Sequence, residues 1–144
     1  MSTRILHISD IHIGRDEDED KNFDVVVQHI IDKGENGWKE NKPIILITGD
    51  IVNDGEEVQF LHARNYLYRL QNAGFTIRLI PGNHDYGKKG NWAEEENYEK
   101  FKEYFSIFHE IEYPFCESLN DHFFIGLNSM KAESDGFDKI FADG

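Results

Sequence analysis

Cysteine and long hydrophobic runs are scarce in this sequence of 144 residues, and each absence excludes a class of protein. The only cysteine, Cys116, permits no internal disulfide, which is typical of a protein from a reducing compartment. No apolar run is long enough to cross a bilayer, and the N-terminal sequence MSTRILHISD lacks the apolar stretch of a signal peptide. We therefore expect a soluble, cytoplasmic protein.

Positive charge is also in short supply. The chain has 15 Lys and Arg residues against 28 Asp and Glu residues, which gives a formal net charge of −13 at pH 7. A surface of this sign repels phosphate backbones and anionic lipids, so the composition argues against nucleic-acid and membrane binding through overall charge. Only a local site that contains metal ions would reverse the field around it.

Short apolar runs alternate with helical patterns along the chain. Segments 4–9 and 43–49 are rich in isoleucine, as buried parallel strands tend to be, and segment 76–82 is a weaker version. Apolar residues at helical spacing predict three helices, each with one inward face. These faces consist of Phe23, Val26, Val27, Ile30 and Ile31, then Phe60, Leu61, Leu67 and Leu70, then Tyr98, Phe101, Phe105 and Phe108.

Two further strand-like segments, YPFCES and HFFIGLNS, follow the third helix and could form a hairpin across LND. The resulting order β-α-β-α-β-α-β-β predicts an α/β sandwich in a single domain, residues 1–144. The acidic run DEDED at 16–20 is most simply a solvated loop, because like charges repel one another. For segment 86–98, which includes Lys88, Lys89 and Trp92, a solvated loop is the preferred interpretation and a substrate lid is the alternative.

Polar residues follow each of the first three predicted strands. The first strand ends in SDIH, with Asp10 and His12 two residues apart, so an extended segment would point both side chains the same way. The second ends in TGD, with Asp50, and the third in PGNHD, with Asn83 and His84. Because ligand sites in parallel sheets form outside the carboxyl ends of the strands, we expect these groups to share one crevice.

Divalent cations would make such a cluster stable. Asp10, Asp50 and the neighbouring Asp85 would repel one another and raise their own pKa values unless cations lay among them. Carboxylate, imidazole and amide groups without a thiolate suit Mn, Fe or Zn ions. A central carboxylate such as Asp50 can bridge two metal ions, and paired ions are a device for in-line attack on phosphorus.

Simpler interpretations exist for these residues taken singly. A lone Asp or Asn after a strand is more often a turn or helix cap than a ligand, and only the series of three strand ends favours a site. His7 alternates with Leu6 and Ile8 inside the first strand. We interpret it as a hydrogen-bonded core histidine.

Together the segments SDIHIG, TGDIVNDG and PGNHD resemble, in this order, the motifs of the calcineurin-like metallophosphoesterases. The resemblance runs from about Arg4 to the GLNS that ends at Ser129, and implies a metallophosphoesterase-type α-β-β-α sandwich. It also implies a metal-dependent phosphoesterase that hydrolyses phosphodiester or phosphomonoester bonds with a metal-bound hydroxide. The cofactors would be two divalent metal ions (Mn, Fe or Zn), and the partner a small phosphoester substrate.

The resemblance assigns a role to each matching residue. Asp10 and His12 would bind the first metal ion, Asp50 would bridge, and Asn83 would bind the second ion. His84 would not be a ligand but would donate a proton to the leaving group. For Asp85 a turn cap is slightly preferred to an anchor for the loop. The side chain of Asn53 would orient the imidazole of His84 without stabilising its cation as a carboxylate does.

Two departures from the family pattern narrow the expectation. The GDIVNDG sequence has Asn53 where the GDxVDRG of the protein phosphatase branch has Asp, and it lacks that branch's Arg, which argues against a phosphoprotein phosphatase and favours small esters. No histidine follows His122, so the later ligand His and G-H-x-H motifs are missing. We therefore expect the N-terminal half of a domain, with a weak second metal site, truncated or completed by a domain-swapped homo-oligomer. A non-catalytic interaction module with partial metal binding is the alternative function.

Overall fold

The computed structural model describes residues 3–87, 95–120 and 122–130. Lys88, Lys89 and Trp92, for which a loop or a lid is expected, lie outside these ranges. The elements are β1 (Ile5–Ile8), α1 (Glu17–Asn36), β2 (Ile44–Thr48), α2 (Glu57–Asn72), β3 (Thr76–Ile80), the 3-10 helix η1 (His84–Tyr86), α3 (Glu95–Phe105), β4 (Phe115–Leu119) and β5 (His122–Gly126). The predicted order of strands and α-helices is confirmed, and η1 is an addition.

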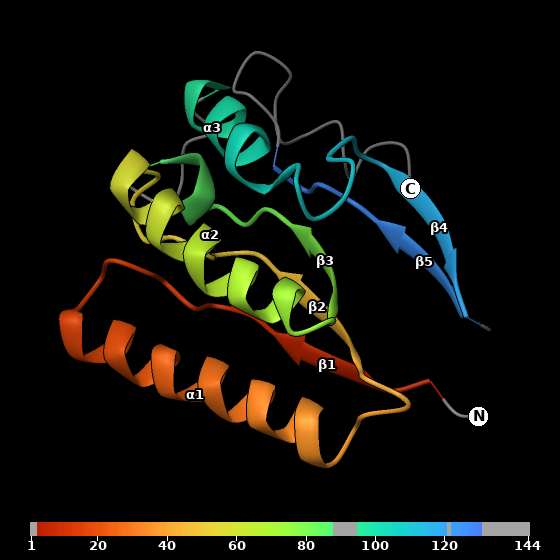
Figure 1. Ribbon diagram of the computed structural model, residues 1–144. Coiled ribbons are helices and arrows are strands. Elements are labelled where there is room, and N and C mark those ends of the chain that lie inside the picture. The colour runs from red at the N-terminus through yellow and green to blue at the C-terminus, as the bar shows by residue number, and fades with distance from the viewer. Residues whose placement is uncertain (1–2, 88–94, 121, 131–144) are drawn as a thin grey trace.

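The first three strands form a parallel sheet in the order β1-β2-β3. Ile5 pairs with Ile44, and Ile44 in turn with Thr76, so the strands run in step and their carboxyl ends lie at one edge. In Figure 1, α1 and α2 lie on one side of this sheet and the β4–β5 hairpin lies on the other. The mixed α/β fold with a parallel sheet is therefore as predicted.

The hydrophobic core lies between the sheet and the helices. Ile45 and Leu79 are buried in it against Val27 of α1 and Phe60 of α2. Each such side chain contributes about 1.5–3 kcal/mol when it is fully buried. The predicted inward faces are largely confirmed, but Val26 and Leu61 are exposed to 47% and 44%. The face that each of α1 and α2 buries is thus narrower than the apolar face predicted from the sequence.

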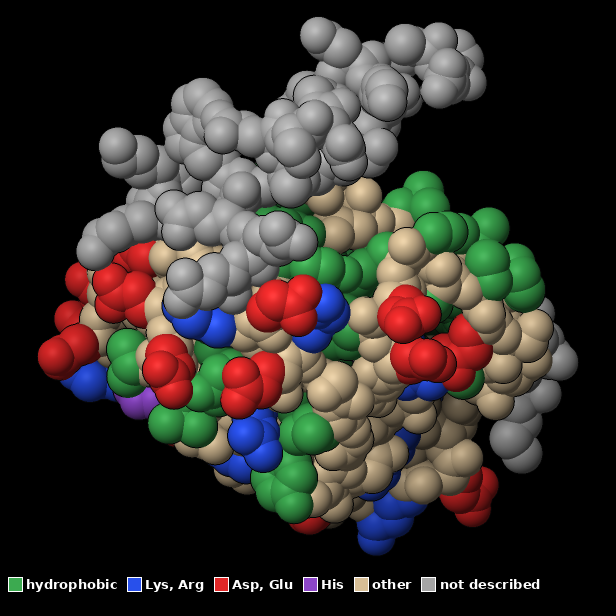
Figure 2. Space-filling view, turned by 90° about the horizontal axis from the view of Figure 1, so that it is seen from above, with side chains coloured by type: hydrophobic (Ala, Val, Ile, Leu, Met, Phe, Trp, Pro, Cys, Tyr) green, Lys and Arg blue, Asp and Glu red, His purple; other side chains and the backbone are tan. Residues whose placement is uncertain are grey.

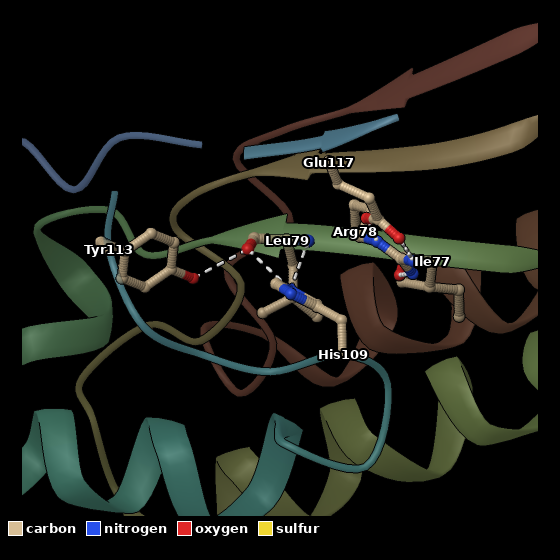
Figure 3. Close-up of polar contacts among 6 residues, drawn as sticks. All are labelled: Ile77, Arg78, Leu79, His109, Tyr113 and Glu117. Carbon is tan, nitrogen blue, oxygen red and sulfur yellow. Dashed lines mark hydrogen bonds and ion pairs between the residues drawn. The ribbon is translucent and has the colours of Figure 1, made fainter. Parts of the chain in front are cut away.

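The hairpin of β4 and β5 is antiparallel, as predicted, and lies on the opposite side of the sheet from α1 and α2 (Figure 1). Arg78 of β3 forms an ion pair with Glu117 of β4 and donates from its Nη1 to the carbonyl of Ile77, 2.8 Å away. In Figure 3, Glu117 points toward Arg78 on β3. The ion pair therefore joins the hairpin to the strand that leads to His84.

Two side chains cover the outer edge of β3. The hydroxyl of Tyr113 donates to the carbonyl of Leu79 over 2.8 Å, and the N–H of Leu79 lies 3.1 Å from Nε2 of His109 (Figure 3). A sheet edge presents unpaired backbone groups, and these contacts satisfy both groups of Leu79. The segment between α3 and β4 is thereby fixed to the sheet.

The acidic run at 16–20 does not form a solvated loop, and that prediction is wrong. Asp16 is the N-cap of α1, because its carboxylate accepts from the backbone N–H of Asp18 at 2.8 Å and of Glu19 at 3.4 Å. Residues 17–20 form the first helical turn, where negative charge is stabilised by the unpaired N–H groups and the helix dipole. Arg15 also pairs with Glu19 at 2.6 Å.

His7 is hydrogen-bonded as predicted but is not a core residue. Its Nε2 lies 2.6 Å from the hydroxyl oxygen of Thr48, and the side chain is exposed. The register places His7 on the sheet face of Leu46 and Arg78, opposite the face that packs on α1 and α2. Alternation within a strand identifies two faces but does not say which one is covered.

The surface agrees with the acidic composition. Seen from above in Figure 2, Asp and Glu side chains are spread among Lys, Arg and hydrophobic side chains. In the ranges that the structure describes, no helix combines the length and apolar character needed to span a membrane. Cys116 is a free, exposed thiol on β4.

Candidate metal centre

The loops that follow β2 and β3 approach each other at two glycines. A methyl group on Gly49, whose φ is +89°, would lie 2.8 Å from the Cα of Gly82, and one on Gly82 would collide with the carboxylate of Asp50. Only glycine allows so close an approach, and at Gly49 it also allows the left-handed backbone. The two glycines therefore bring Asp50 next to the turn that carries Asn83 and His84.

The loop after β1 is held beside the loop after β2 by backbone hydrogen bonds. The N–H of Asp10 donates to the carbonyl of Gly49 at 3.2 Å, and the N–H of His12 donates to that of Asp50 at 2.9 Å. Ile13 and Val52 form an isolated parallel bridge further along. These bonds continue the sheet beyond its strands and place His12 against Asp50.

Three of the polar residues adopt a left-handed backbone. The φ angles of Asp10, His12 and Asp50 are 55°, 52° and 52°. The prediction that Asp10 and His12 lie in an extended segment is therefore wrong, because the chain turns as it leaves β1. A left-handed conformation costs a non-glycine residue about 1–2 kcal/mol, and strain of this kind is concentrated at functional sites.

His12, Asp50 and His84 form a group that could hold a metal ion. One ligand atom of each residue lies within 4.8 Å of the others, and all three side chains are half-buried. The two imidazole rings meet edge to face, with centroids 4.5 Å apart. The Nδ1 of His12 is buried and has no hydrogen-bond partner among the described residues. Because a buried nitrogen without a partner is costly, and imidazole and carboxylate are ligands of divalent metals, the residues fit such an ion.

The other two predicted ligands lie in the same loops. Asp10 is exposed and does not belong to the group of three described above. Asn83 is half-buried and directly precedes η1, and its carbonyl accepts from the N–H of Tyr86 at 3.2 Å. Metal binding by Asp10 and Asn83 stays a prediction.

The position of His84 is fixed at two points. Its backbone N–H donates to Oδ1 of Asp50 at 2.9 Å, and its Nδ1 lies 2.7 Å from the backbone carbonyl oxygen of Asn53. The predicted role for the Asn53 side chain is wrong, because this amide donates to Asp54 at 2.9 Å. A carbonyl only accepts, so Nδ1 of His84 carries the proton and Nε2 is free for the site.

Asp85 is fully buried below these loops. Its carboxylate accepts from the backbone N–H of Ile51 and of Val52, each at 2.9 Å, and from that of Gly82 at 2.8 Å. Burial raises its pKa to about 7, although the three hydrogen bonds oppose the shift, and the charge of Asp50 raises the pKa further. Asp85 therefore caps its own turn, as predicted, and also anchors the loop after β2.

Gln59 supports the site and was not predicted. Its side chain is 5% exposed, and its Oε1 accepts from the N–H of Asp54 at 2.8 Å. The same side chain fills the space where a Cβ on Gly14 would lie. The available signal was its place at the third position of α2, where Gln and Glu commonly bond back to the preceding loop.

Comparisons with known proteins agree with this geometry. The family model for calcineurin-like phosphoesterases matches residues 3–143. The chain is 36% identical over 93 residues to the DNA double-strand break repair protein Mre11 of Sulfurisphaera tokodaii, a match that covers 60% of this chain and 23% of that protein. It is 35% identical over 89 residues to the glycerophosphodiester phosphodiesterase GpdQ of Enterobacter lignolyticus, covering 56% and 29%. The chain thus spans only about a quarter of the length of these relatives.

Proposed function

Because the chain belongs to the calcineurin-like phosphoesterase family, we propose that it contributes to a metal-dependent hydrolysis of phosphoester bonds at the site formed by His12, Asp50 and His84. The observation that carries this proposal is the approach of one ligand atom each from His12, Asp50 and His84 to within 4.8 Å of one another, in a group where Nδ1 of His12 is buried without a hydrogen-bond partner among the described residues. Imidazole and carboxylate groups that approach this closely suit a divalent cation, which would also offset the charge of Asp50.

In this proposal the protein residues hold and orient the reacting groups. His12 and Asp50 bind divalent cations, with Asp10 and Asn83 as the further ligands that the sequence predicts. Bound Mn, Fe or Zn supplies positive charge to the phosphoryl oxygens and lowers the pKa of water. The backbone bond from His84 to Asp50 keeps the imidazole next to the carboxylate.

His84 acts as the proton donor to the leaving group. Its Nδ1–H stays bonded to the carbonyl of Asn53, so the imidazolium releases its other proton, from Nε2. The neutral ring that remains has its proton on Nδ1 and keeps the same hydrogen bond. Proton transfer therefore requires no change in the orientation of the ring.

Small phosphodiesters or phosphomonoesters are the proposed substrates. One similar protein is a phosphodiesterase by name, and another is a DNA repair protein. The formal net charge of −13 disfavours a long polyanion more than a small ester, because repulsion grows with the number of phosphates.

Two assays with Mn²⁺ test the role of His84. Bis-(p-nitrophenyl) phosphate has a weakly basic leaving group that needs little protonation, whereas a dialkyl phosphate needs a proton donor. We expect His84→Ala to lower kcat for the dialkyl ester by about 10²–10⁴-fold, with a smaller loss for the nitrophenyl ester. Mn²⁺ affinity, measured by calorimetry, should change little. The exposed His62 on α2 provides a matched control, His62→Ala.

Other results would change the assignment. Equal losses on both esters together with weaker Mn²⁺ binding would make His84 a metal ligand, a role that its place in the group of three also permits. A wild-type protein that binds Mn²⁺ but hydrolyses neither ester would favour the non-catalytic interaction module.

Exposed apolar side chains on and after β5 support that second candidate. Phe123, Ile125 and Leu127 are exposed to 65%, 60% and 61%, and they alternate along the chain on one face. Contiguous exposed apolar surface is typical of protein contacts. A domain-swapped homo-oligomer is the proposed partner, and light scattering at several protein concentrations tests it: a monomer at all of them would contradict it.

A further inference from the structure

Asp85 is unusual in being a buried charged residue. Among the residues that the structure describes, it is the only Asp, Glu, Lys or Arg side chain in the interior, with an exposure of 0%. Its contacts are backbone N–H groups rather than a cationic side chain. A carboxylate is costly to bury, so its position directly below the candidate metal centre calls for a function.

The two oxygens of Asp85 bind two different loops. Oδ1 accepts from Ile51 and Val52, which directly follow Asp50 in the loop after β2. Oδ2 accepts from Gly82, two residues before His84 in the loop after β3. The side chain therefore joins the segment that carries Asp50 to the segment that carries His84.

Asp50 forms the reciprocal link. Its Oδ1 accepts from the backbone N–H of His84 at 2.9 Å. A carboxylate from each loop thus accepts from the backbone of the other loop, and the two links close a ring of hydrogen bonds. Such a ring fixes both the separation of the loops and the orientation of the Asp50 carboxylate.

We propose that Asp85 is a positioning residue that sets the geometry between Asp50, where the cation binds, and His84, the proton donor. This inference rests on the proposed function. Asp85 itself would touch neither the cation nor the substrate. Groups behind metal ligands orient them, and replacing such a group typically lowers metal affinity or activity by about 10–100-fold.

Asp85→Asn is the selective test, because it keeps the shape and removes one acceptor. The amide oxygen can serve one loop, while the amide NH₂ faces the N–H donors of the other. We expect Co²⁺ affinity to fall about 10–100-fold. The visible spectrum of bound Co²⁺, which reports its coordination geometry, should also change. Ile30→Val, a small core change in α1, provides a control for lost stability and should leave the Co²⁺ spectrum unaltered.

A second measurement uses the wild type alone, in case the variant does not fold. Zn²⁺ should slow amide hydrogen exchange at Ile51, Val52 and Gly82 together, because binding at Asp50 tightens both links. Slowing at Ile51 and Val52 without Gly82 would overturn the inference.

The outcomes separate the two proposals. Unchanged Co²⁺ affinity and spectrum in folded Asp85→Asn would overturn the positioning role and leave the proposed function intact. A wild type that binds neither Co²⁺ nor Zn²⁺ would overturn both.

Discussion

The Nδ1 of His84 lies 2.7 Å from the backbone carbonyl oxygen of Asn53. The imidazole is therefore oriented by the main chain of the loop after β2 and not by a side chain. A carbonyl carries only a partial negative charge, so it fixes the tautomer while stabilising the imidazolium less than a carboxylate would. The orientation of His84 also becomes independent of the side chain at position 53.

This independence predicts a mild effect for Asn53→Ala. The variant keeps the carbonyl that accepts from His84 and the N–H that donates to Ile13 at 3.1 Å, and loses only the hydrogen bond to Asp54. We expect kcat/KM for bis-(p-nitrophenyl) phosphate to change by less than about threefold, as for substitutions that cost roughly 0.5 kcal/mol. Steady-state kinetics with Mn²⁺ would check this. A loss of tenfold or more would show that the side chain takes part.

Gly82→Ala should damage both the fold and the site. The new methyl group would collide with the carboxylate and backbone nitrogen of Asp50, where the two loops meet. We expect the free energy of unfolding in urea to fall by about 1–3 kcal/mol, as for overpacked sites. Mn²⁺ affinity in calorimetry should fall as well, because Asp50 must move.

A matched glycine variant separates this effect from a general cost of alanine. Gly37, the C-cap of α1, has φ −115°, and a methyl group there would meet only the carbonyl of Lys33 at 3.3 Å. Gly37→Ala should leave Mn²⁺ affinity unaltered. Equal behaviour of the two variants would contradict the close approach of the loops.

The convergence of the site could be predicted because it depends on strand order and direction. Asp10, Asp50 and Asn83 each follow a strand, and parallel strands end at one edge. The start of helix α1 could also have been predicted, since Asp16 followed by acidic residues is a signal for the N-terminus of a helix. Repulsion between the acidic side chains of residues 16–20 suggested a loop instead, but the unpaired N–H groups of the first helical turn stabilise these charges.

The remaining features depend on contacts that sequence patterns do not encode. Asp85 accepts hydrogen bonds from Ile51 and Val52, which lie more than thirty residues away in the sequence. To predict these bonds, one would have to know how the loops after β2 and β3 are positioned relative to each other. The carbonyl of Asn53 has no sequence signature, because every residue has one. The exposure of His7 depends on where the hairpin lies over the sheet.

His109 gives the fold a titratable contact outside the metal centre. It is half-buried at the edge of β3, near Arg78 and Glu117 (Figure 3), and Glu110 is a further neighbouring charged group. Nε2 of His109 lies 3.1 Å from the backbone nitrogen of Leu79 and 3.1 Å from its carbonyl oxygen, which also accepts from Tyr113, and only a neutral ring can accept from the N–H. Burial, and next the charge of Arg78, lowers the pKa of His109 below its usual 6.5.

The lowered pKa predicts that the contact weakens in mild acid. Below about pH 6.5 the unfolded chain binds a proton at His109 before the folded chain does, so this contribution to stability is complete above that pH and is lost as the pH falls. The raised pKa of Asp85, about 7, acts in the opposite direction over the same range. The effect must therefore be read from a variant that changes His109 alone.

His109→Gln provides this comparison, because a Gln oxygen can still accept from the N–H of Leu79 but does not titrate. We expect the wild type to lose stability relative to His109→Gln as the pH falls from about 8 to about 5.5, measured as free energies of unfolding in urea. The exposed His29 of α1 serves as the control, and the difference between wild type and His29→Gln should stay nearly constant. If the His109→Gln difference is equally flat, His109 is not held neutral at the edge of β3, and the Leu79 N–H must be satisfied in another way.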